Sequence, residues 1–181
     1  MKIVSSFPGV YRSHFLGEKI LIASSGRQYS KDKRDQFLGA LSLDPSRTFF
    51  VTQVHGNEIV EVDEKTSDTS SLQADGLITS VPGFGIGIRT ADCLPVFFAS
   101  SDQTVIGLAH AGWRGLHQGI LEKMVKLFRG SYFIEAATIR ILIGPAIRSC
   151  CYEVGEEFCG YFPETCASST GSKPKMDLVR E

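Results

Sequence analysis

Two histidines and one cysteine stand where apolar segments of the chain end. His55 and His110 each close an apolar run, and Cys93 lies in a tight turn between two such runs. Two imidazoles and a thiolate match the ligand preferences of Zn²⁺ and of copper ions, and three protein ligands leave a fourth position for water or substrate. The spacing matches no zinc finger or ribbon, so spacing alone does not establish a metal site. The residues therefore have two interpretations: a three-ligand metal site, or two strand-capping histidines and a buried structural cysteine.

The same residues also fit a metal-free cysteine hydrolase. Cys93 would be the thiolate nucleophile and His110 its base, with Asp92 or Gln53 orienting the imidazole. Both the metal site and the hydrolase need the thiolate form of the cysteine. Arg89 precedes this turn and is expected either to face the same cleft or to pair with Asp92. The linear sequence leaves the two chemistries open.

A glycine-rich turn leads directly from the His110 segment into an amphipathic one. It contains Gly112, Trp113, Arg114 and Gly115. Glycines let backbone amides approach an anion, and an arginine can grip a phosphate or carboxylate with two hydrogen bonds. The tryptophan could stack on a flat base, or it could pack into the core of an ordinary strand-to-helix turn. The turn therefore predicts an anion or substrate site, with a purely structural turn as the alternative.

Two further features are interpreted as structural. Asp75 precedes a glycine and is typical of a turn residue rather than a catalytic acid. Cys150 and Cys151 are expected to be free and mostly packed thiols, because a disulfide between neighbouring residues is strained.

The composition restricts the class of protein. The chain has 181 residues, 43% of them apolar and 22% charged, which excludes a disordered chain, a coiled coil and a collagen-like fibre. A formal net charge of −1 lacks the basic field of non-specific nucleic-acid binding, so no nucleic-acid partner is expected. No apolar run is long enough to cross a membrane, and the first residues lack a signal-peptide pattern. An odd number of cysteines, five, favours a cytoplasmic location.

The candidate residues need a sheet to position them. Helical spacing is expected after a cap at Ser30, from Leu116 to Phe128, and more weakly from Glu153 to Phe162. The order of elements indicates an α/β or α+β sandwich with a mixed sheet. Short apolar runs rich in β-branched and aromatic residues predict strands at 20–23, 48–54, 59–62, 76–79, 85–89, 94–99, 104–110 and 138–143.

Taken in order, several phrases resemble one known family. They are Gln-Val-His-Gly at 53–56, Ala-Asp-Gly at 74–76, Thr-Ala-Asp-Cys-Leu-Pro at 90–95, Ala-His-Ala-Gly-Trp-Arg-Gly at 109–115, Ile-Gly-Pro-Ala-Ile at 143–147 and Tyr-Glu-Val-Gly at 152–155. The chain is similar to the laccase-domain family, also labelled multicopper polyphenol oxidase or purine nucleoside phosphorylase family. The resemblance covers roughly residues 48–160, and the phrases around Cys93 and His110 are together highly specific.

The resemblance implies a single laccase-like α/β domain, 1–181, with an architecture similar to that of cysteine-hydrolase toxins. It implies zinc on His55, Cys93 and His110, with copper named in older family labels. It also implies phosphorolysis of adenosine, inosine, guanosine and methylthioadenosine, together with adenosine deamination. A bacterial branch linked to peptidoglycan-precursor editing implies an amidase-like hydrolase instead. For phosphorolysis, Arg89, Arg114 and the amides of Gly112–Gly115 are the natural phosphate holders.

The chain departs from the family pattern at two places. The segment from Tyr11 to Gln28 carries only a degraded form of the family's early arginine and glycine loop. Met176 to Glu181 resembles the first turn of a helix, capped by Asp177, after which the family continues with a segment that this sequence does not contain. A third hypothesis is therefore a truncated relative that binds metal without turnover. An exposed sheet edge would then favour homo-oligomers.

Overall fold

A five-stranded mixed sheet is the centre of the molecule. The computed structural model describes residues 10–14, 16–26, 29, 33–162 and 174–180. The strand order is β4-β5-β8-β7-β9, with β4 and β5 parallel and the other neighbours antiparallel. The mixed α/β class expected from the sequence is confirmed. The strands are β4 (Ile59–Val62), β5 (Gly76–Thr79), β7 (Leu94–Ser100), β8 (Ile106–Ala111) and β9 (Ile139–Ile143).

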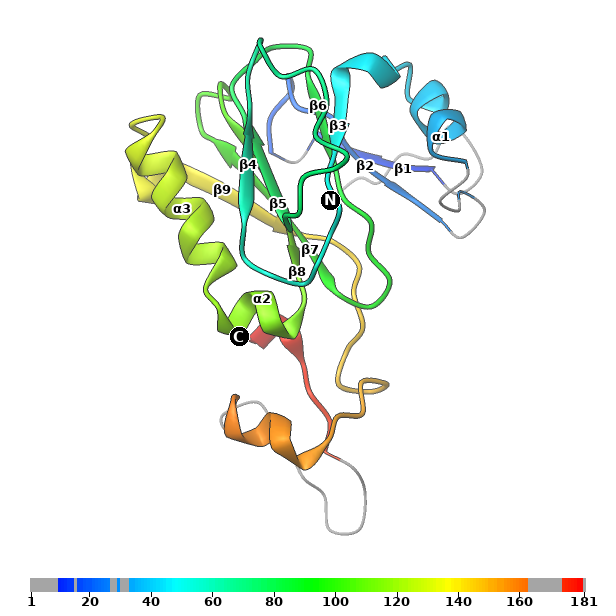
Figure 1. Cartoon of the computed structure of the whole chain (residues 1–181), viewed down its shortest axis with the longest axis vertical. Helices are drawn as coiled ribbons and strands as arrows, with labels where there is room; N and C mark the ends of the chain where they lie inside the picture. Colours follow the sequence, from blue (N-terminus) through cyan, green and yellow to red (C-terminus); the bar gives the residue numbers. More distant parts are fainter. Residues whose placement is uncertain (1–9, 15, 27–28, 30–32, 163–173, 181) are drawn as a thin grey trace.

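The inner strands are buried because both faces of the sheet are covered. Every residue of β5 is buried, and β7 and β8 are buried at nearly every position, which explains their uninterrupted apolar sequences. Helix α3 packs across β4, β5 and β8 (Figure 1). A Cβ added at Gly107 would stand 2.8 Å from the sulfur of Met124, so this glycine lets the helix approach β8 closely.

The helix predicted over Leu116 to Phe128 is two helices. α2 spans Trp113–His117 and α3 spans Ile120–Gly130. Gly119 separates them with φ of +77°, a left-handed conformation that residues with a side chain rarely adopt. The chain therefore turns between the two helices, and only α3 runs along the sheet.

Two small sheets flank the central one. β1 (Val10–Ser13) pairs antiparallel with β2 (Ile22–Ser25), and β3 (Thr48–Phe50) pairs parallel with β6 (Gly85–Gly87). β1 was not expected, because its mixed Val-Tyr-Arg-Ser sequence carries no clear alternation. The strands expected at 20–23, 48–54 and 85–89 are shifted or shorter.

The remaining helices are short. α1 spans Arg34–Ala40, and the expected cap, Ser30, lies outside the described residues. Single 3-10 turns occur at Pro45–Arg47 and Ala136–Thr138. The helix expected over Glu153 to Phe162 is reduced to a 3-10 turn at Glu156–Gly160, bounded by the two glycines that interrupt its spacing.

The described C-terminal residues fold back onto the core. Met176 and Leu178 are buried in the same apolar cluster as α3, and Leu178–Arg180 forms a 3-10 turn beside α2 (Figure 1). The backbone N–H of Val179 donates to the carboxylate of Asp177 at 3.2 Å, which confirms the expected cap. Arg148 donates to the same carboxylate at 2.9 Å. No helix among the described residues has the length and apolar character needed to span a membrane.

Candidate metal centre

His110 is fixed by the sheet. It lies on β8 near the end of the strand, and only 3% of its surface is exposed. Its Nδ1 lies 2.7 Å from Oδ1 of Asp75, a carboxylate with no exposed surface. A carboxylate only accepts hydrogen bonds, so Nδ1 carries the proton and donates a hydrogen bond to Asp75. Nε2 is then the nitrogen with a free lone pair, as a metal-ligating histidine requires.

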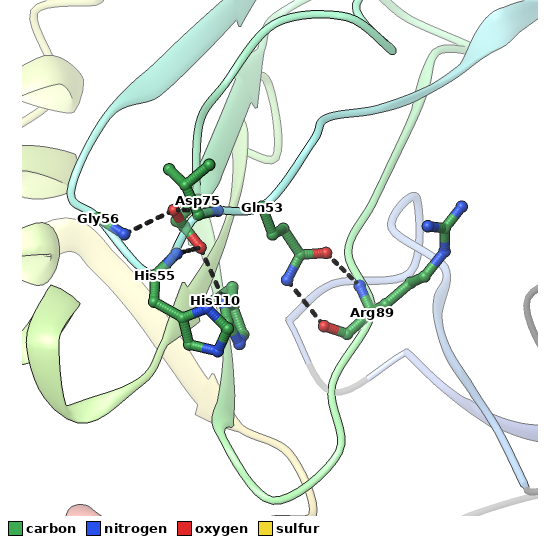
Figure 2. A network of polar contacts seen from close by, with 7 residues as sticks. Gln53, His55, Gly56, Asp75, Arg89 and His110 are labelled. Atoms are coloured by element: carbon green, nitrogen blue, oxygen red, sulfur yellow. Dashed lines mark hydrogen bonds and ion pairs between the residues drawn. The ribbon is translucent and has the colours of Figure 1, made fainter.

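His55 is fixed by the same carboxylate through its backbone. The residue lies in the loop between β3 and β4 rather than at the end of a strand, because β3 stops at Phe50. Asp75 accepts hydrogen bonds from the backbone N–H groups of Val54 at 3.1 Å, His55 at 3.0 Å and Gly56 at 2.7 Å (Figure 2). These bonds hold His55 at a φ of +59°, an uncommon conformation for a residue with a side chain.

Cys93 completes the group from a third segment. It lies directly before β7, after Asp92 with a φ of +82°, in the tight turn expected from the sequence. Burial raises the pKa of its thiol, and the nearby carboxylates of Asp92 and Asp75 raise it further. A Cβ added at Gly112 would stand 3.1 Å from the Cys93 sulfur and 3.2 Å from Cδ2 of His55. The glycine thus leaves the space in which the sulfur and the imidazole meet.

The three side chains fit a single metal ion. One ligand atom each from His55, Cys93 and His110 can be chosen so that all lie within 4.8 Å of one another, and the two imidazole rings meet edge to face. Ligands at bonds of about 2.0–2.3 Å to a tetrahedral ion lie about 3.5 Å apart, so small side-chain movements would close the site. Two imidazoles and a thiolate suit zinc and copper alike. The predicted three-residue cluster is therefore a possible metal site in the folded chain.

A cavity of about 580 Å³ opens onto the two histidines. None of its lining residues is acidic, and Arg34 and Arg89 bring two positive charges. Arg34 lies over the ring of Phe50 at 5.4 Å and pairs with Asp35 at 3.0 Å. The lining residues are Arg34, Phe50, Val51, Thr52, Gln53, His55, Ser70, Arg89, Ala91 and His110.

Arg89 and Gln53 form one unit at the wall of this cavity. The Gln53 amide donates to the carbonyl of Arg89 and accepts from its N–H, both at 2.8 Å. Both ends of the amide are thus engaged with the main chain, and the predicted substrate-binding role of Gln53 stays a prediction. The Arg89 guanidinium extends away from the imidazoles (Figure 2) and makes no ion pair with Asp92 or another described residue.

The glycine-rich turn lies apart from the cavity lining. Trp113 is half-buried against the rings of Phe158 and Tyr161, at centroid distances of 4.6 and 5.5 Å. The guanidinium of Arg114 lies 5.1 Å from the Trp113 ring centroid, and neither residue lines the cavity. Gly115 is buried where an added Cβ would stand 2.7 Å from the carbonyl oxygen of Gly56. These contacts match the structural alternative for the turn, and its predicted phosphate role stays a prediction.

Asp75 is the residue that sequence reasoning undervalued. The interpretation as a turn residue was incomplete, because its buried carboxylate connects the two histidines of the site. The available signal was its position directly before β5, every residue of which is buried. A carboxylate at the entry to a buried strand needs partners, and here they come from distant parts of the chain.

Comparison with known proteins identifies the family. The family model described as multi-copper polyphenol oxidoreductase laccase matches residues 25–180, and the chain belongs to this family. A purine nucleoside phosphorylase of Aquifex aeolicus is 33% identical over 138 residues, 75% of this chain and 64% of that protein. Another from Xylella fastidiosa, strain Temecula1, is 35% identical over 164 residues, 87% of this chain and 61% of that protein.

The fold is also shared with a solved structure. The hypothetical protein YfiH of Bacillus licheniformis superimposes with a TM-score of 0.76 at 27% identity, covering 87% of this chain and 64% of that one. The chain therefore spans less than two thirds of the length of each of these relatives.

Proposed function

We propose that this protein is a zinc-dependent enzyme that acts on purine nucleosides, by phosphorolysis and by deamination of adenosine. The observation that carries the proposal is the convergence of His55, Cys93 and His110, whose two histidines are both held by Asp75 and both line one cavity. The names of the relatives support the nucleoside substrate. Two imidazoles and a thiolate support a bound metal. The absence of acidic residues from the cavity lining supports an anionic co-substrate.

The metal ligands, Asp75 and the arginines have separate roles in the proposed reaction. Zinc, when held by the two imidazoles and the thiolate, would supply positive charge for Lewis-acid catalysis. Asp75 keeps the proton of His110 on Nδ1 and orients the ring. In phosphorolysis a phosphate oxygen attacks C1′ of the ribose while the glycosidic bond breaks, and the base leaves with the bonding electrons. In this proposal the cavity-lining residues Arg89 and Arg34 hold the dianion during this step, and the Arg89 guanidinium turns toward the imidazoles to do so.

A zinc titration followed by product analysis tests the proposal. The purified chain, stripped of metal and reloaded with one equivalent of Zn²⁺, is incubated with adenosine in the presence and absence of phosphate. We expect adenine and ribose 1-phosphate only when phosphate is present, and inosine in both cases. His55→Ala and Cys93→Ser should lose both products, whereas His117→Ala, an exposed histidine outside the cavity lining, should retain them. Stoichiometric zinc without product would support the third hypothesis, a metal-binding relative without turnover.

The metal-free hydrolase remains a second candidate, with one observation in its favour. His110 lies between Cys93 and Asp75, so in this candidate Cys93 would be the nucleophile, His110 its base and Asp75, rather than Asp92 or Gln53, the orienting group. The raised pKa of the Cys93 thiol weighs against it, because a nucleophile needs the thiolate. Amide hydrolysis that persists in the presence of a chelator and is lost in Cys93→Ser would favour this candidate over the zinc enzyme.

A further inference from the structure

Two adjacent thiols lie on an exposed turn outside the metal centre. Cys150 and Cys151 are both exposed and free, and their sulfur atoms lie 3.1 Å apart. The expectation that they are free is confirmed, and the expectation that they are mostly packed is wrong, because both are exposed. A pair of thiols at this distance, open to solvent, has no evident packing role.

The backbone of the turn holds the two residues in place. The N–H groups of Cys151 and Tyr152 both donate to the carbonyl of Arg148, at 2.9 and 3.0 Å. The Lys175 ammonium donates to the carbonyl of Cys150 at 3.2 Å. The sulfur separation exceeds the disulfide bond length of about 2.05 Å by only about 1 Å, so the two sulfurs start close to bonding distance.

We propose that Cys150 and Cys151 form a redox-active vicinal dithiol that a hydroperoxide oxidises to an intramolecular disulfide. One thiolate attacks the peroxide oxygen, which breaks the O–O bond and leaves a sulfenic acid and an alcohol or water. The second sulfur then attacks the sulfenyl sulfur and expels water. Overall, two S–H bonds and one O–O bond break, and one S–S bond and two O–H bonds form, so the peroxide is the two-electron acceptor.

The disulfide would be easily reversed. Neighbouring Cα atoms lie about 3.8 Å apart, below the usual range of about 4.4–6.8 Å for disulfide-bonded residues. Strained and exposed disulfides are reduced more readily than structural ones. The turn is also connected to the metal centre, because the N–H of Ile147 donates to the carbonyl of Asp92, the neighbour of Cys93, at 2.9 Å.

Peptide mapping of the oxidised full-length chain tests the proposal directly. After treatment with one equivalent of hydrogen peroxide and alkylation of the remaining thiols, trypsin and a glutamate-specific protease release residues 149–153, which contain only these two cysteines. We expect this peptide to be two hydrogens lighter and unalkylated, and to become doubly alkylated after treatment with dithiothreitol. A peptide in which either cysteine is alkylated, over-oxidised or linked to another chain would overturn the proposal.

Phenylarsine oxide provides an independent probe, because its arsenic binds two neighbouring thiols and releases water. We expect one equivalent to bind the reduced protein, and Cys150→Ser and Cys151→Ser each to abolish binding. The turn is exposed, so neither replacement should unfold the chain. Cys93→Ser is the matched control and should bind the arsenical as the wild type does. Binding that survives both turn variants, or that is lost in the control, would assign the dithiol elsewhere.

Discussion

The two histidines of the metal centre are positioned in opposite ways. His110 is buried on a strand inside the sheet, whereas His55 is exposed on a loop and has a left-handed backbone. Asp75 joins them, through the ring of the first and the backbone of the second. One buried carboxylate therefore holds a loop without regular structure in a fixed position relative to the sheet.

The largest effect is expected for Asp75→Asn, because the change affects both histidines at once. The amide has an N–H group where the carboxylate accepts hydrogen bonds, so at least one buried donor is left without a partner. We expect the free energy of unfolding to fall by about 3 kcal/mol. Zinc affinity should fall about 10- to 100-fold, as for other residues that orient a metal ligand. Urea denaturation and zinc titration measure the two effects.

Asp68→Asn is the matched control for this change. Asp68 is an exposed aspartate that accepts hydrogen bonds from the backbone and the hydroxyl of Ser70, within its own turn. We expect neither stability nor zinc affinity to change measurably. If Asp75→Asn behaved in the same way as this control, the buried carboxylate would not connect the two sides of the site.

Replacing the histidines one at a time separates their structural roles. His110→Ala should lower the unfolding free energy of the metal-free protein by about 2 kcal/mol, because it removes the ring that donates to buried Asp75. His55→Ala should leave the stability of the metal-free protein nearly unchanged, because this residue is exposed. Both variants should lose stoichiometric zinc by elemental analysis. Equal destabilisation by the two changes would contradict the contrast between strand and loop.

Gly112→Ala tests the space between the loop histidine and the cysteine. The φ of Gly112 is −75°, so alanine is free of backbone strain, and its methyl group would press on the Cys93 sulfur and the His55 ring. We expect zinc affinity to fall about tenfold by displacement of a ligand, an effect of about 1.4 kcal/mol. Isothermal titration of the metal measures it. Gly39→Ala, with nothing within 4 Å of the added Cβ, is the control and should bind zinc normally.

The smallest effect is expected for Gln53→Ala, which removes the hydrogen bonds between the His55 loop and the backbone of Arg89, in the segment before Cys93. Loss of the two hydrogen bonds to Arg89 should cost about 1 kcal/mol and speed hydrogen exchange at the Arg89 amide. Amide exchange followed by mass spectrometry measures the change. Gln36→Ala, at an exposed position of α1, should show none. Unchanged exchange at Arg89 would mean that the turn is held by other contacts.

Sequence patterns predicted the sheet well where one physical signal dominates. The strands at 59–62 and 76–79 have the bounds expected from their apolar runs, and the run predicted at 94–99 became β7 with one further residue. The pattern failed where a single residue changes the backbone. Gly119, with its positive φ, separates α2 from α3 although the apolar spacing continues through it. The prediction missed this break because apolar periodicity carries no information about φ.

The residue types alone identify the side chains that are able to bind a metal, and the sequence phrases around them indicate the family. That His55, Cys93 and His110 share one site, and that Asp75 supports two of them, follows from how the chain folds. The same holds for Cys150 and Cys151, whose exposure sets them apart from packed thiols. The physical reason is that residue type sets the chemistry of a group. Its burial and its partners depend on segments that are distant in the chain and meet only when the sheet forms.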